Sequence, residues 1–365
     1  MKAGSPGAVA VRLSSQDEEI PGRKARAVRE SQLRGLAASG RVIAAVGWVF
    51  FGVLPFRTYG QITPADMTQV RDATGNRIEA LTILGGDYGL AAANFRSTGN
   101  FTLGETADAT LGITKFGGAG DIGDPQPLAS LPVGWQPRLQ GNMGYLDGTQ
   151  HLHSGLLEGD VTEIKSYGIE FGGGARFWMN DRLSFAPTLM GLYGHTWETY
   201  TANSAFMRKN FTTATELGLI NFSVDTWTII PRVNIQYLLT WDRTLIALSS
   251  EPAYYHTGSF NGSNPYLHVN GDSATWANTV DVDIPLGVSL FGHELHTGGY
   301  YRWTGLYGSL RSGLNESSLS EVHGRIVLDF LNQLWKVQWI GIGASYLFGP
   351  TVSGWSAGID ATFRF

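Results

Sequence analysis

Acidic, basic and histidine side chains recur at alternate positions of several apolar segments of the sequence. Glu170 and Arg176, for example, alternate with Phe171 and Phe177, so that charged and apolar groups fall on opposite faces of an extended chain. Because both charge signs occur on the polar face, these groups could form ion pairs, bind ions or transfer protons. The candidates of this kind are Glu170, Arg176, Arg232, Asp281, Asp283, Glu294, His296, Arg302, His323, Arg325, Asp329, Asp360 and Arg364.

Histidines between these segments are a second candidate for chemistry. His151 and His153 form an H-x-H pair, with Ser154 beside them and Asp160 further along, and His195 begins another polar stretch. Ser, His and Asp are the residue types of hydrolytic sites and paired histidines can bind metal, but the spacing supplies no third ligand. We therefore expect no catalytic residues, no metal and no cofactor, and hydrolysis is the alternative.

The composition excludes several classes of protein. The 365-residue chain has no Cys, 48 Gly, only 16% charged residues and a net charge of −5 at pH 7. The acidic balance leaves no basic surface for nucleic acid, and the lack of Cys excludes disulfide scaffolds and thiol nucleophiles. A mean hydropathy of −0.06 argues against a bundle of membrane helices, each of which needs about 20 consecutive apolar residues.

The elements that must position the charged residues are long strands of period two. The last segment puts Trp355, Ile359 and Phe363 on one face and Asp360 and Arg364 on the other. The alternation recurs over residues 167–177, 224–239, 280–290, 301–307 and 322–330. Such strands suit a barrel that turns apolar side chains to lipid and polar ones to its lumen. The predicted fold is all-β, a transmembrane antiparallel β-barrel of about twelve strands, which begin near residues 88–95 and 107–116.

The lengths of the connections fit this fold. Short turns are expected at residues 180–181, 241–243, 291–293 and 332–333, and long loops at 147–165, 195–222, 257–273 and 309–320. Outer-membrane barrels join their strands by short periplasmic turns and longer extracellular loops. Both ends of the barrel are therefore expected on the periplasmic side, and only the connection at residues 116–134 breaks the rule.

Three regions are predicted along the chain. Residues 1–60 form a disordered extension and a signal-peptide-like segment, whose apolar core is residues 42–56. Residues 61–77 form a short helix or linker over Ile62 to Ala73, with Thr63 as N-cap and Pro64 at the first helical position, which can enter the lumen. Residues 78–365 form the barrel.

The C-terminus carries a family resemblance. Phe363 and Phe365 end the chain in a pattern that resembles the signal read by the barrel-assembly machinery. With the short helix and about twelve strands, residues 62–365 resemble the translocator barrel of autotransporters, and in particular solitary outer-membrane autotransporter β-barrel domains. The resemblance implies a Gram-negative outer-membrane location reached through the periplasm, with outer-membrane lipid and lipopolysaccharide and the assembly machinery as partners. After export only a short segment is expected to precede the first strand, so passenger secretion is not carried over, and the resemblance supplies no catalytic residues.

We therefore expect an integral outer-membrane barrel without a passenger, acting as a structural barrel or a narrow channel. The charged lumen residues suit either a salt-bridged filling or an aqueous path. An outer-membrane protease or lipid-modifying hydrolase that uses the loop His, Asp and Ser residues is the alternative. A helix that plugs the lumen would favour the closed state.

Overall fold

The computed structural model of the protein describes residues 64–87, 90, 96–103, 109–128, 134–153, 157–334 and 337–363. The predicted disordered extension and signal-like segment, as well as Arg364 and Phe365, lie outside these residues. So does most of the strand predicted at residues 88–95; the first strand described begins at Arg96.

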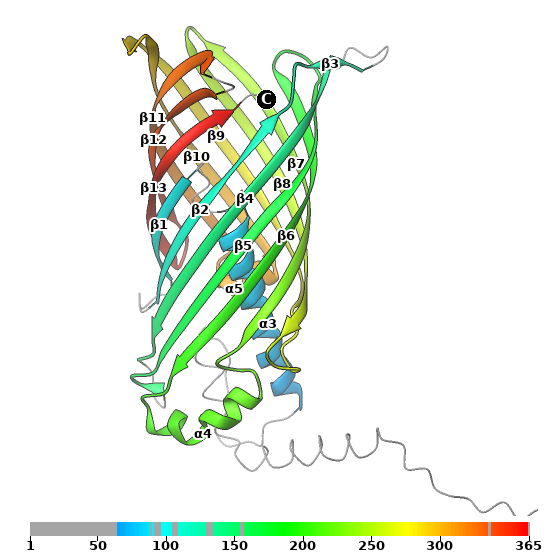
Figure 1. The fold of residues 1–365 in the computed structure, drawn as a ribbon, viewed down its shortest axis with the longest axis vertical. Coiled ribbons are helices and arrows are strands. Elements are labelled where there is room, and N and C mark those ends of the chain that lie inside the picture. The colour runs from blue at the N-terminus through cyan, green and yellow to red at the C-terminus, as the bar shows by residue number, and fades with distance from the viewer. Residues whose placement is uncertain are drawn as a thin grey trace, which may run out of the picture.

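Long antiparallel strands form a closed barrel (Figure 1). The ring closes because β1 pairs with both β2 and β13, and β2 pairs with β4, while the two-residue β3 only extends the edge of β4. Twelve long strands therefore make up the wall within the described residues. The strands are β1 (Arg96–Leu103), β2 (Ala109–Asp121), β3 (Gln126–Pro127), β4 (Gly134–His151), β5 (Val161–Trp178), β6 (Leu183–Thr201), β7 (Ser223–Trp241), β8 (Thr244–Gly262), β9 (Asn270–Leu290), β10 (His293–Gly308), β11 (Ser318–Leu334), β12 (Val337–Phe348) and β13 (Val352–Phe363).

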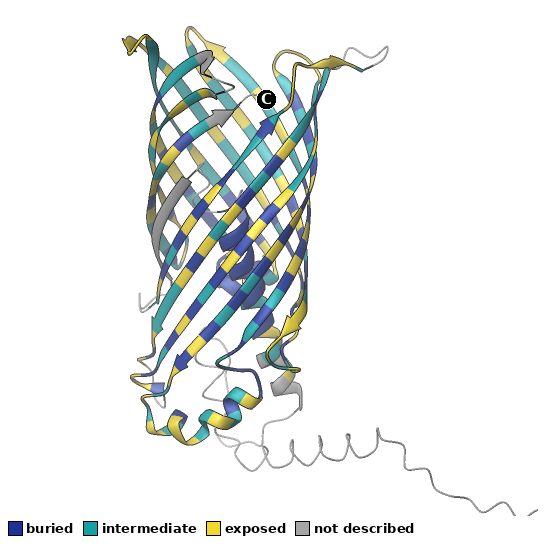
Figure 2. Ribbon diagram, viewed as in Figure 1, coloured by how far each residue is buried: buried dark blue, intermediate teal, exposed yellow. Residues whose placement is uncertain are grey.

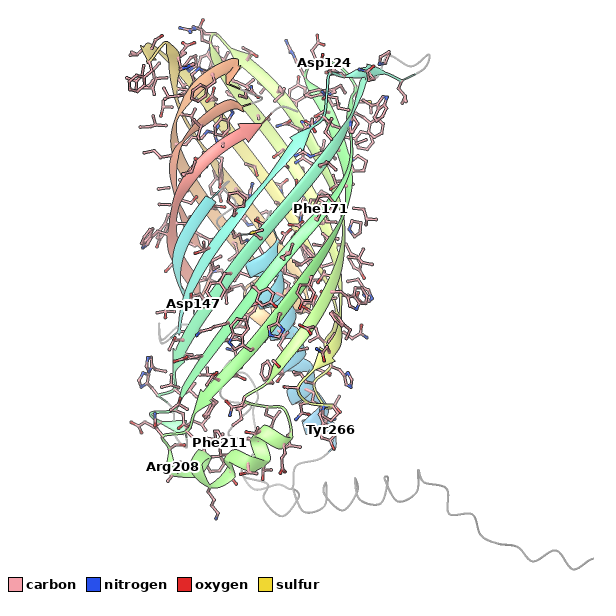
Figure 3. All side chains as sticks on the ribbon, viewed as in Figure 1. Asp124, Asp147, Phe171, Arg208, Phe211 and Tyr266 are labelled. Carbon is pink, nitrogen blue, oxygen red and sulfur yellow. The ribbon has the colours of Figure 1, made fainter. Side chains whose placement is uncertain are left out.

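Alternation along each strand divides the wall into an outer and an inner face. On β5, Glu170 is 1% exposed whereas its neighbour Phe171, labelled in Figure 3, is 66% exposed. The same banding runs around the barrel in Figure 2. Apolar side chains cover the outer face because only they are stable against lipid, and polar side chains turn inward.

The two ends of the barrel differ in their connections. β5–β6, β7–β8, β9–β10 and β11–β12 are joined by short links at one end, with β2–β4 as the longer exception that the sequence indicated. The other end carries α4 (Ala205–Glu216) between β6 and β7, and α5 (Ser309–Leu314) between β10 and β11. We call these the short-turn end and the long-loop end.

A helix inside the barrel corrects the predicted domain boundaries. The helix α3 spans Pro64–Gly86, well past the linker predicted at residues 61–77, and it lies in the long-loop half of the lumen (Figure 1). Ile78, Leu81 and Ile83 are among its fully or nearly fully buried side chains. From Ile78 to Gly86 the helix is buried on all sides and needs no polar stripe, so the amphipathic period that marks ordinary helices is missing there.

The start of α3 lies at the long-loop end of the barrel. The Arg71 guanidinium lies over the Tyr266 ring, 4.8 Å from its centroid, in the β8–β9 loop. The helix thus enters the lumen from the long-loop end (Figure 1). The last turn of α3 packs closely against β5. A Cβ atom added to Gly168 of this strand would lie only 2.7 Å from the Cα atom of Gly86. No helix in the described part of the chain is long and apolar enough to cross a membrane.

Candidate functional site

Asp87 ends α3 in the middle of the lumen, held by groups from three strands. Its carboxylate pairs with the Arg232 guanidinium of β7 and accepts a hydrogen bond of 3.0 Å from the Tyr255 hydroxyl of β8. The ammonium group of Lys115 on β2 donates to the carbonyls of Asp87 and Leu90. We call Asp87, Lys115, Arg232 and Tyr255 the Asp87 latch.

The latch is buried and surrounded by further carboxylates. The side chains of Arg232 and Asp87 are 3% and 1% exposed. Glu170 and Glu251 lie 3.8 Å and 3.7 Å from the Arg232 guanidinium. Because an unpaired charge is costly away from water, Arg232 stabilises both the end of the helix and the acidic groups beside it.

Polar contacts also hold the rest of α3 against the wall. The Thr82 hydroxyl lies 3.4 Å from the hydroxyls of Thr196 and Thr226. Glu79 accepts a hydrogen bond of 2.6 Å from the Ser273 hydroxyl, and burial raises the pKa of Glu79 to about 7. Together with α5, these contacts fill the long-loop half of the lumen.

A second buried network lies on the strands at the other side of the lumen. His323 of β11 contacts the Ser345 hydroxyl at 2.9 Å through Nδ1 and the Asp360 carboxylate at 3.0 Å through Nε2. The Tyr300 ring stacks on His323 and its hydroxyl donates to Glu321. A serine, a histidine and an aspartate thus meet, but each is at most 5% exposed, which makes the group part of the buried polar filling of the lumen.

The short-turn half of the lumen is lined differently, because its charged side chains keep contact with water. On β4 and β5, Arg138 and Arg176 share the carboxylate of Asp121, at 2.8 Å and 3.0 Å. Gln236 accepts a further hydrogen bond from Arg176. Asp121 is 23% exposed and Arg138 17% exposed. We call this group the basic wall.

Carboxylates dominate the facing strands. His296 of β10 contacts Asp283 at 2.7 Å through Nδ1, and its Nε2 lies 3.9 Å from Glu294 and 4.0 Å from Asp329. The carboxylates of Asp283, Glu294 and Asp329 are between 20% and 29% exposed. We call these four residues the acidic wall. Beside them, Arg325 makes a bidentate pair with Asp281 at 2.8 Å and 3.1 Å.

The predicted site residues therefore fall into two groups that line the lumen. The buried group contains Glu170, Arg176, Arg232, His323 and Asp360. The partly exposed group contains Asp281, Asp283, Glu294, His296, Arg302, Arg325 and Asp329, and Arg302 donates to the Thr279 hydroxyl at 3.3 Å. Arg364 lies outside the described residues. Sequence reasoning missed Asp87, Lys115, Asp121, Glu251 and Ser345; the alternation of residues 111–121 was the only signal for the two on β2.

The loop residues considered for hydrolysis do not converge. The rings of His151 and His153 stack with centroids 6.3 Å apart, and Ser154 lies outside the described residues. Asp160 is fully buried, where it accepts hydrogen bonds from Tyr200, Asn203 and Ser204 and so ties the β4–β5 loop to the start of α4. Within the ranges that the structure covers, no group of three or more His, Cys, Asp or Glu side chains is arranged to hold a metal.

His195 lies far from that pair, on the outer face of β6. Its Nδ1 contacts Asp225 at 2.6 Å, and its ring packs on Tyr167 and Trp197. The same outward pattern occurs at His256 with Asp272, at 2.8 Å. These pairs belong to the polar and aromatic belt of the barrel surface.

The geometry defines a transmembrane β-barrel whose lumen contains its own helix α3, and comparison with known proteins identifies the family. Residues 128–359 match the family described as the solitary outer membrane autotransporter β-barrel domain, and the chain belongs to it. The prediction of an outer-membrane barrel of the autotransporter kind is thereby confirmed, as is the bacterial outer-membrane location. No curated protein sequence matches the chain.

Solved structures share the fold at low sequence identity. The transport unit of the autotransporter AIDA-I from Escherichia coli is 10% identical, with a TM-score of 0.50 over 79% of this chain and 99% of that one. The translocator domain of the autotransporter NalP from Neisseria meningitidis is also 10% identical, with a TM-score of 0.47 over 82% and 98%. At these identities the likeness extends to the fold alone.

Proposed function

We propose that this outer-membrane barrel is a narrow channel that its own helix α3 holds closed. The observation that carries the proposal is the Asp87 latch, which ties the end of the helix to the barrel wall by a buried ion pair. Side chains of the short-turn half retain water contact, so only the long-loop half needs to be cleared for a continuous path. By the rule for outer-membrane barrels, that half faces the outside and the water-lined half faces the periplasm.

The test restrains the helix and records single-channel conductance of the refolded full chain in a planar bilayer. The chain has no Cys, so Thr82→Cys with Thr226→Cys introduces one specific pair at positions whose hydroxyls lie 3.4 Å apart. Wild type and the reduced variant should show discrete openings under voltage, and the oxidised variant should be silent. Each single-Cys variant is the matched control.

Two results would overturn the proposal. Openings that persist in the oxidised variant would show that ions do not need the helix to move. A folded wild-type barrel, checked by heat-modifiable gel migration, that stays silent at all voltages would favour the purely structural barrel.

A catalytic role is not part of the proposal. Asp160 is engaged in loop contacts and His195 faces outward, so the hydrolase alternative has no assembled site among the described residues. That alternative requires the purified barrel to hydrolyse a peptide or lipid A and His153→Ala to abolish the activity. As partners we propose outer-membrane lipopolysaccharide around the barrel and, during biogenesis, the assembly machinery, which would read Phe363 and Phe365.

A further inference from the structure

A tyrosine, a histidine and an aspartate form a cluster on β6 and β7. The Tyr193 hydroxyl donates to the Asp225 carboxylate at 2.8 Å, and His195 Nδ1 contacts the same oxygen at 2.6 Å. Asn261 of β8 donates to the other carboxylate oxygen at 2.7 Å. Because a carboxylate only accepts hydrogen bonds, Nδ1 carries the proton, and Nε2 of the neutral ring is an acceptor for a further donor.

The same arrangement recurs on β8 and β9. The Tyr254 hydroxyl donates to the Asp272 carboxylate at 2.6 Å, and His256 Nδ1 contacts it at 2.8 Å. In both places the tyrosine and the histidine are two residues apart on one strand, and the aspartate lies on the next strand. We call these two groups the Tyr-His-Asp clusters.

The neighbours of these residues along the strands show that both clusters face away from the lumen. A Cβ atom at Gly194 would lie only 2.4 Å from a side chain of α3. Tyr255 donates to Asp87 at the end of this helix. Ser273 donates to Glu79 within it. Since successive side chains of a strand point to opposite faces, the clusters lie on the outside of the barrel, in its long-loop half.

Trp227 links the two clusters. It lies two residues from Asp225 on β7, and its ring contacts the His256 ring, with centroids 5.4 Å apart. A Cβ atom at Gly258 would lie between 2.7 Å and 3.0 Å from three atoms of the indole, so the ring covers this glycine. Trp227 nevertheless remains 37% exposed. Gly258 therefore lets the indole lie on the strand and present an aromatic surface beside the histidine.

The position of this surface on the barrel indicates what covers it. The surface continues into the apolar band that faces lipid, where Leu189 and Ile229 on the same strands are 60% and 47% exposed. Aromatic rings with polar groups gather where the apolar part of a bilayer meets its headgroups. The long-loop end of an outer-membrane barrel faces outside. There the lipid proposed above is lipopolysaccharide, whose sugars form the headgroup.

We propose that the two Tyr-His-Asp clusters and Trp227 bind the sugar headgroup of lipopolysaccharide. The aromatic surface packs on the apolar C–H face of a pyranose ring, and the carboxylates and histidine Nε2 atoms accept hydrogen bonds from its hydroxyl groups. These residues include two carboxylates and no Lys or Arg, so they suit sugar hydroxyls better than phosphates. The inference rests on the lipid partner in the proposed function and is independent of the channel.

Binding can be measured by native mass spectrometry of the detergent-purified full chain. The probes are a lipopolysaccharide with a short core and phosphatidylglycerol, which is also anionic but carries no sugar. We expect the lipopolysaccharide to bind at least about tenfold more tightly, a difference of about 1.4 kcal/mol. Trp227→Ala and Asp225→Ala should each remove about tenfold of its affinity, whereas phosphatidylglycerol binding should not change.

Two further variants test whether the arrangement itself is responsible. Gly258→Ala keeps the indole but displaces it, and should weaken lipopolysaccharide binding in the same direction as Trp227→Ala. Trp355→Ala is the matched control, since it removes an aromatic ring that is 54% exposed on β13, six strands from β7 around the ring. It should leave binding unchanged. Heat-modifiable migration establishes that each variant has folded.

Three outcomes would overturn the inference. Trp355→Ala that weakens binding as much as Trp227→Ala would assign the contact to the aromatic belt as a whole. Equal binding of lipopolysaccharide and phosphatidylglycerol would show that the sugar is not recognised. Loss of binding when divalent cations are chelated would assign the contact to a cation bridge. Because the channel is tested by conductance, failure of one proposal is distinguishable from failure of the other.

Discussion

Replacement of Arg232 by Met should release the helix from the lumen. The substitution removes the guanidinium that pairs with the buried carboxylate of Asp87 and lies beside Glu170, and it leaves Lys115 as the remaining cation of the latch, while Glu251 is 26% exposed and retains some water. Removal of one partner from a buried ion pair costs about 3–5 kcal/mol. At about 1.4 kcal/mol per factor of ten, the equilibrium between docked and released helix should shift by roughly two to three and a half orders of magnitude.

Single-channel recording measures this shift as open probability. Arg232→Met should open far more often than wild type at the same voltage. Arg243→Met is the matched control, since it removes an arginine from an exposed pair that is worth at most about 1 kcal/mol. The double variant Asp87→Leu with Arg232→Met removes both partners of the main ion pair and should recover part of the closed state, because only Glu170 then remains without its guanidinium.

A folding check and a second variant test whether the latch holds the helix. Heat-modifiable migration establishes that the Arg232→Met barrel has folded, and Asp87→Asn alters the latch from the helix and leaves the wall unchanged. If folded Arg232→Met and Asp87→Asn barrels both remain as closed as wild type, the latch does not hold the helix.

Three further outcomes follow from the same structure. The pKa of Glu79 is raised by burial to about 7, so its protonated form favours docking of α3 at low pH, and this stabilisation is lost as pH rises from about 4.5 through about 7. Openings of wild type should therefore be more frequent at about pH 8.5 than at about pH 5, and Glu79→Gln should make this difference smaller. Asp160→Ala should destabilise the α4 loop by about 3 kcal/mol through lost hydrogen bonds to a buried carboxylate, measured as faster proteolysis at that loop, and unchanged proteolysis would contradict it. Phe171→Arg should destabilise the barrel by about 2–4 kcal/mol in a denaturant titration from vesicles, whereas Glu163→Arg, on the same face beyond the apolar band, should have little effect.

The alternation predicted the inward and outward faces of the strands correctly over most of the barrel. The inner side chains of β5, β7 and β11, with Glu170, Arg232 and His323 among them, are those the sequence indicated. The reason is local: lipid outside and polar side chains inside impose a period of two on every strand. The sequence also predicted which connections are long loops and which are short turns, because the length of a connection is the number of residues between two alternating segments.

The helix and its latch were harder to read. The sequence did not indicate that α3 extends to Gly86, beyond the predicted linker. The reason is that the second half of the helix is buried and lacks the amphipathic pattern that marks a helix in water. Asp87 does not belong to an alternating segment of the sequence, so no pattern indicated its role, and its partner Arg232 is distant in sequence. Long-range contacts of this kind depend on which strands close the ring.

The chain alone therefore determines that its strands span a membrane with a polar interior, since that pattern is repeated in each segment. It does not determine which charges meet. Arg176 and Asp329 belong to strands that face each other only because the ring has twelve members and closes between β1 and β13. Closure and stagger of the barrel are collective properties of all the strands, so the contacts of α3 with the wall and the Asp87 latch exist only in the tertiary structure.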